Sequence, residues 1–180
     1  MKLYPINSGL FKLDGGAMFG VVPKSLWEKT NPADDNNMCS WSMRCLLIEL
    51  EDKLILIDTG IGNKQNDKFF SFFYLHGRYN LKQSIEKAGF STNEVTDVIL
   101  THLHFDHCGG AVNKKGNNYE LAFPNAKYWT NKEHWKWANH PNQREKASFL
   151  KENFLPIKEQ KKLFFLEEGS FHKKIKIKFF

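Results

Sequence analysis

The chain has 180 residues and a formal net charge of +6, with 41% hydrophobic and 26% charged residues. This length and composition suit one folded domain and exclude a disordered or collagen-like chain. The excess charge comes mostly from scattered lysines, which favours a solvated surface over a nucleic-acid interface. Because no apolar run could span a bilayer and no apolar leader follows Met1, we expect a cytoplasmic protein without a membrane segment.

The first third of the chain predicts a buried β-hairpin. Residues 45–50 and 54–57 are apolar runs typical of strands, and residues 51–53 form a tight turn between them. Residues 31–37 are expected to form a polar loop before this hairpin. The glycine-rich residues 13–20 predict a flexible loop, in which Met18 and Phe19 either line an apolar substrate pocket or serve as ordinary core residues.

The rest of the chain alternates between helical and extended patterns. Leu81, Ile85 and Ala88 have helical spacing, with Gly89 after the helix end. Further helices are expected from Asn131 through residue 137 and over residues 144–154, where Pro156 ends the second. Strands are expected over residues 95–100, 126–129, 163–166 and 174–179, the last half-buried because lysines alternate with apolar residues. This order indicates an α/β (α+β layered) domain with helices outside the sheets.

Residues 101–110 (THLHFDHCGG) contain the candidate metal ligands of the sequence. His102 and His104 directly follow a predicted strand, and residues two apart in extended backbone point the same way. Asp106 and His107 come next, in a turn that the following glycines permit. Imidazole and carboxylate are ligands that zinc prefers, so the stretch offers donors for two incomplete coordination spheres.

Other polar residues have two readings from sequence alone. Asp58 follows a strand and either holds the second nitrogen of a metal-bound histidine or begins a turn. Cys108 is either a buried thiol or a further ligand, whereas Cys39 and Cys45 read as small buried residues. The odd number of cysteines indicates reduced thiols. Packing or surface roles are expected for the remaining histidines, His76, His134 and His140.

Residues 56–60 (LIDTG) and 101–110 resemble the first two motifs of the metallo-β-lactamase superfamily, within a similarity spanning about residues 44–129. Residues 123–126 (FPNA) are similar to the branch holding N-acyl-homoserine-lactone lactonases and methyl-parathion-hydrolase-like enzymes. The resemblance implies an αββα metallo-β-lactamase sandwich, here its first half and part of the second. It also implies a site for two divalent metal ions between the sheets.

The resemblance assigns residue roles and a reaction. His102 and His104 would bind the first metal, and Asp106 and His107 the second. Asp58 would hydrogen-bond the second ring nitrogen of a metal-bound histidine. Asp106 would also be catalytic, as proton donor to the leaving group. Zinc is the expected metal, with manganese and iron compatible. The implied function is a metal-dependent hydrolase that uses a metal-bound hydroxide on an ester, lactone or related bond of a small-molecule substrate.

Members of the family supply further ligands later in the chain: a third histidine after a strand, a bridging aspartate and a final histidine. His172 precedes the last predicted strand, so we do not expect it to replace the third histidine. A single domain over residues 1–180, incomplete at its C-terminal end, is therefore expected, with the remaining ligands beyond residue 180. Two alternatives stay open: a non-catalytic metal-binding or assembly module, for instance a homodimer, and an iron-dependent oxidoreductase of the same fold.

Overall fold

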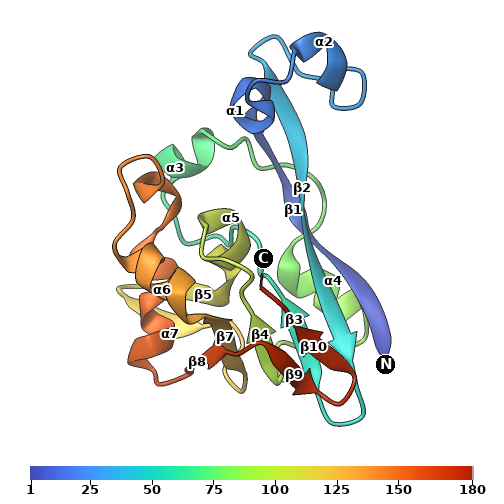
Figure 1. The fold of residues 1–180 in the computed structure, drawn as a ribbon, viewed down its shortest axis with the longest axis vertical. Coiled ribbons are helices and arrows are strands. Elements are labelled where there is room, and N and C mark those ends of the chain that lie inside the picture. Colours follow the sequence, from blue (N-terminus) through green and yellow to red (C-terminus); the bar gives the residue numbers. More distant parts are fainter. Residues whose placement is uncertain (180) are drawn as a thin grey trace.

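The computed structural model describes residues 1–179 and is built around one six-stranded sheet (Figure 1). The strands lie in the order β1-β2-β3-β4-β7-β8. The first three pair antiparallel, and each later strand lies parallel to its neighbour. Their bounds are β1 Lys2–Asp14, β2 Met38–Glu49, β3 Leu54–Ile57, β4 Asp97–Ile99, β7 Lys127–Asn131 and β8 Leu163–Leu166. The α/β fold class and the hairpin over residues 45–57 are confirmed.

The two faces of the sheet bury different residues because side chains alternate along a strand. On one face, helices α4 (Leu81–Lys87), α6 (Lys132–Asn139) and α7 (Leu155–Glu159) cover the strands. The strand residues buried there include Leu47, Leu56, Val98 and Tyr128. The neighbouring residues Ile48, Ile55, Ile99 and Trp129 belong to the core of the opposite face.

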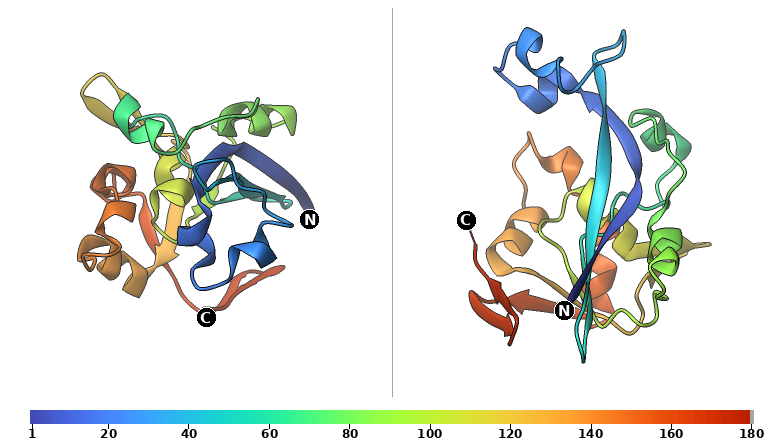
Figure 2. Two further views of the ribbon diagram at one scale, coloured as in Figure 1. Left: turned by 90° about the horizontal axis from the view of Figure 1, so that it is seen from above. Right: turned by 90° about the vertical axis from the view of Figure 1, so that its right-hand side faces the viewer.

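That opposite face carries the β-hairpin of β9 (Gly169–His172) and β10 (Ile175–Ile177). Figure 2 shows this hairpin and α4 on opposite sides of the sheet. Ile175, Ile177 and Phe179 pack onto the face, which confirms a half-buried strand near the chain end. The molecule is therefore layered as helices, sheet and hairpin. No helix within residues 1–179 has the length and apolar character needed to cross a membrane.

The long β1–β2 hairpin extends beyond the rest of the sheet and carries two short helices at its tip (Figure 1). These are α1 (Gly15–Phe19) and α2 (Lys24–Trp27), so the expected flexible loop over residues 13–20 is wrong. The Asp14 carboxylate accepts the Ala17 N–H and caps α1. Phe19 stacks on Trp27 with ring centroids 4.7 Å apart, whereas Met18 remains 47% exposed.

The single helix expected over residues 144–154 is also wrong. Two short 3-10 turns, Lys146–Ser148 and Lys151–Asn153, take its place. Pro156 lies in the first turn of α7 instead of ending a helix, because that position needs no N–H donor. The sequence patterns also missed helix α3 (Asp67–Ser71) and the hairpin of β5 (Val112–Lys115) with β6 (Asn118–Leu121).

Candidate metal centre

Parallel pairing brings three chain segments to one edge of the sheet. β3, β4 and β7 run in the same direction, so their carboxyl ends lie side by side. Asp58 follows β3, the histidine-rich stretch follows β4, and α6 follows β7. The loops interlock, because Asp58 N–H donates to Ile99 O at 2.9 Å and Thr59 N–H donates to His107 O at 2.7 Å.

The predicted histidines come together at this edge. The ring centroids of His102 and His104 are 4.6 Å apart, and those of His102 and His107 are 3.9 Å apart. Asp106 and His107 lie in a single helical turn, α5 (Phe105–Cys108). Phe149 closes one side, with its ring centroid 4.7 Å from that of His104. The cluster is thus partly buried against an aromatic ring.

Asp58 is the central hydrogen-bond acceptor of the loops. Its carboxylate accepts the Thr101 N–H at 2.9 Å and the Thr101 hydroxyl at 2.8 Å. It also lies 2.8 Å from Nδ1 of His107. Because a carboxylate only accepts, the proton of this bond must reside on Nδ1. Asp58 therefore leaves Nε2 of neutral His107 with a free lone pair, as a metal ligand requires.

The pKa values fit rings that present lone pairs. Burial, followed by the charges of His107 and His104, lowers the pKa of His102 to about 4. Burial also lowers the pKa of His104. Burial opposes protonation of His107 as well, yet the Asp58 hydrogen bond and the charges of Asp106 and Asp58 leave its pKa raised. Two of the three rings are thus neutral at neutral pH, and the third lies between carboxylates.

The donors of this cluster are of the kinds that divalent metal ions bind. His107 Nε2 lies 3.5 Å from Asp106 Oδ2, and these two donors could share one cation when the imidazole is neutral. Across residues 1–179, no group of three or more His, Cys, Asp or Glu side chains is placed to hold one ion. The neighbouring donors, His102 beside His104 and Asp106 beside His107, therefore fit open ligand sets and not a closed structural site.

Close backbone packing supports the turn after the histidines. A Cβ on Gly110 would collide with the Thr59 carbonyl oxygen, and one on Gly109 would collide with the Ile61 carbonyl oxygen. The buried Lys64 ammonium donates to the Gly109 carbonyl, and burial lowers its pKa to about 8. Glycine at these positions lets the loop after β3 touch the loop after α5 directly.

His134 is a contributor that the sequence patterns did not single out. Its Nε2 accepts the backbone N–H of Leu103, between His102 and His104, at 2.9 Å. Burial, with the nearby charge of His104, lowers the pKa of His134, which keeps the ring neutral and able to accept. A histidine that accepts a hydrogen bond from a residue 31 positions away has no local sequence pattern by which to recognise it.

The remaining candidates lie outside the cluster. The buried Cys108 thiol donates to the Leu103 carbonyl at 3.3 Å, as expected for a buried thiol. His172 lies 3.2 Å from Asp52 in a surface turn. His76 bonds Ser40 at 2.6 Å, toward the tip of the long hairpin. None of these side chains joins the histidine cluster.

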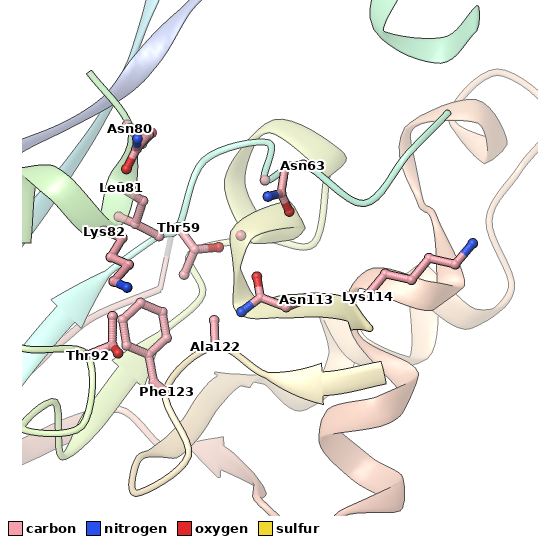
Figure 3. Close-up of a pocket in the computed structure, with 13 residues that line it drawn as sticks. Thr59, Asn63, Asn80, Leu81, Lys82, Thr92, Asn113, Lys114, Ala122 and Phe123 are labelled. Atoms are coloured by element: carbon pink, nitrogen blue, oxygen red, sulfur yellow. The ribbon is translucent and has the colours of Figure 1, made fainter. Parts of the chain in front are cut away.

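Two cavities differ in their relation to the cluster. A cavity of about 120 Å³ lies against Asp106 and His107, and Arg44, Met43 and Phe11 also line it. A larger cavity of about 660 Å³ lies beside Thr59 and Asn113 (Figure 3). Its lining includes Asn63, Asn80, Lys82, Thr92, Asn113 and Phe123, but none of the candidate ligands. The smaller cavity is therefore the one that belongs to the candidate metal centre.

Comparison with known proteins identifies the family of this α/β chain. Residues 44–172 match the model of the metallo-beta-lactamase superfamily. The chain therefore belongs to the metallo-β-lactamase superfamily, as the resemblance predicted. It is 26% identical over 137 residues to an N-acyl homoserine lactonase of Bacillus cereus, covering 71% of this chain and 50% of that protein. The chain thus spans about half the length of the curated relatives it matches.

Solved structures show the same fold. A probable metal-dependent hydrolase from Staphylococcus aureus superimposes with a TM-score of 0.83 at 30% identity, covering 94% of this chain and 60% of that one. A dizinc quorum-quenching lactonase, AidC, superimposes with a TM-score of 0.69 at 25% identity, covering 95% of this chain and 60% of that one. The metallo-β-lactamase fold expected from the motifs is confirmed.

Proposed function

We propose that this chain carries part of the active site of a two-metal hydrolase acting on an ester, lactone or related bond of a small molecule. One observation carries the proposal: the Asp58 carboxylate lies 2.8 Å from Nδ1 of His107, whose Nε2 lies 3.5 Å from the Asp106 carboxylate. The relatives named lactonases support a lactone as substrate class. The lactonase described as dizinc favours zinc.

The residues take separate roles in this proposal. His102 and His104 would hold one ion, and Asp106 and His107 the other. Bound divalent ions supply an activated water at neutral pH and polarise the carbonyl under attack. Asp106 would return a proton to the leaving oxygen. Arg44, which lines the 120 Å³ cavity beside Asp106, would hold the acyl or carboxylate oxygen of the substrate.

Metal content and turnover test this proposal together. The chain would be incubated with Zn²⁺ or Mn²⁺, freed of excess ion, and assayed for bound metal and for opening of an N-acyl homoserine lactone. We expect bound metal, with His102→Ala and Asp106→Asn lowering its amount, and lactone opening where the ligands expected beyond residue 180 are also present. His140→Ala, which changes an exposed histidine outside the cluster, is the matched control. Equal metal content in all four proteins would contradict the proposed site.

A second function is favoured by the absence of any three-donor group within residues 1–179. Such a chain could act as a metal-binding or assembly module whose site is completed by another chain. The molar mass in solution with and without Zn²⁺ separates the two functions. Metal-dependent dimers without lactone opening would favour the assembly module, whereas a monomer that opens lactones would exclude it.

A further inference from the structure

We propose that His134 is a positioning residue for the candidate metal ligands: its Nε2 accepts the Leu103 N–H and fixes the peptide between His102 and His104. Its consequence for metal binding rests on the function proposed above. The hydrogen bond itself is a property of the chain without metal.

The backbone conformation at Leu103 determines how the imidazole rings of His102 and His104 are oriented. His102 and His104 flank this residue, so a rotation of its backbone turns the two imidazoles apart. The Leu103 side chain is fully buried, and a buried N–H needs an acceptor. His134 supplies that acceptor at 2.9 Å. The Leu103 carbonyl is held too, because it accepts the Cys108 thiol at 3.3 Å. Both backbone polar groups of Leu103 are thus paired, and its N–H is paired by a residue outside the motif of residues 101–110.

His134 is itself held in place by the fold. It lies in the first turn of α6, where its own N–H donates to the Asn131 carboxamide oxygen at 2.9 Å. β7, which leads into α6, pairs in parallel with β4, which leads into the histidine stretch. Phe149 packs beside both imidazoles, with centroids 5.7 Å from His134 and 4.7 Å from His104. The acceptor is therefore anchored on a rigid element.

The chain offers a matched set of variants. His134→Phe keeps the ring shape and removes the acceptor. His134→Gln restores an acceptor oxygen at similar reach from the backbone. His140→Phe makes the same chemical change at the end of α6, at an exposed histidine that lies away from Leu103.

The first measurement is amide hydrogen exchange of Leu103 by NMR in the metal-free chain. We expect His134→Phe to speed this exchange by about tenfold or more, and His134→Gln to restore protection. The second is Co²⁺ binding followed by visible absorption, where His134→Phe should weaken affinity about 10–100-fold and shift the bands. His140→Phe should change neither measurement.

Each result decides a separate question. Unchanged Leu103 exchange in His134→Phe, or failure of His134→Gln to restore it, would overturn the positioning role. If His134→Phe does not fold, the ring nitrogen shifts of the unaltered chain decide instead, because a proton on Nε2 of His134 excludes the bond. Absence of Co²⁺ binding by the unaltered chain would count against the proposed function alone, since Leu103 exchange needs no metal.

Discussion

Asp58→Asn is expected to disable the candidate metal centre while leaving the fold intact. The substitution preserves shape, and asparagine tolerates the positive φ of 58° found at this residue. The carboxamide oxygen can keep the two bonds from Thr101, and the new NH₂ group then faces Nδ1 of His107. To accept from that NH₂ group, the ring must move its proton to Nε2. The atom predicted to bind metal then carries a hydrogen.

The magnitude follows from the bonds that change. Loss of a charge-assisted hydrogen bond in this partly buried site costs about 1–3 kcal/mol of folding free energy. Replacing the partner that orients a ligand ring lowers metal affinity about 10–100-fold. A 10–100-fold loss of metal affinity corresponds to about 1.4–2.8 kcal/mol, so the losses of affinity and of stability should be similar in free energy.

Long-range proton–nitrogen NMR of His107 provides the assay. Spectra would be recorded at about pH 9, well above the ordinary imidazole pKa of about 6.5, so that the ring is neutral. We expect the proton on Nδ1 in the unaltered chain and on Nε2 in Asp58→Asn, with urea unfolding measured in parallel. A ring that keeps its Nδ1 proton in Asp58→Asn would refute the reasoning.

Two further substitutions test the packing behind the motif. Because the pKa of Lys64 is lowered to about 8 in the folded chain, the unfolded chain binds more protons than the folded chain between pH 8 and 10.5. The free energy of unfolding therefore increases as pH rises through this range. Lys64→Met should remove this gain of about 3 kcal/mol, so that its unfolding free energy does not show the rise seen for the unaltered chain over this pH range. Gly109→Ala should destabilise by about 1–3 kcal/mol through its clash with the Ile61 carbonyl, although Gly109 has helical backbone angles. Gly16→Ala, which would meet only side-chain atoms, should cost less in the same thermal melts.

The parts of the fold that sequence predicted have strong local patterns. The apolar runs at residues 45–50 and 54–57 and the cap at Asn131 each depend on a few adjacent residues. The β1 strand escaped prediction because its register shifts between Asn7 and Leu10, which breaks the alternation that marks a strand. The tip helices escaped because glycines suggested a loop, whereas stacking of Phe19 on Trp27 orders them.

The expected helix over residues 144–154 failed for a geometric reason. Phe149 and Phe154 are both buried, and residues five apart lie about 140° apart around a helix. Two short turns separated by extended backbone bury both rings. In the candidate site, the clustering of the candidate ligands was predictable because they follow one strand. His134 was not, because its bond to Leu103 spans 31 residues and depends on the pairing of β4 with β7.

The contact between the loop after β3 and the loop after α5 has a consequence for how this site can be varied. Gly62, Gly109 and Gly110 let the two backbones touch with no side chain between them. Substitutions in one loop are therefore expected to show strong epistasis with substitutions in the other. Libraries that diversify only one loop will mostly sample clashes. A transplanted motif would need residues 58–62 and 101–110 moved together as one interlocking unit.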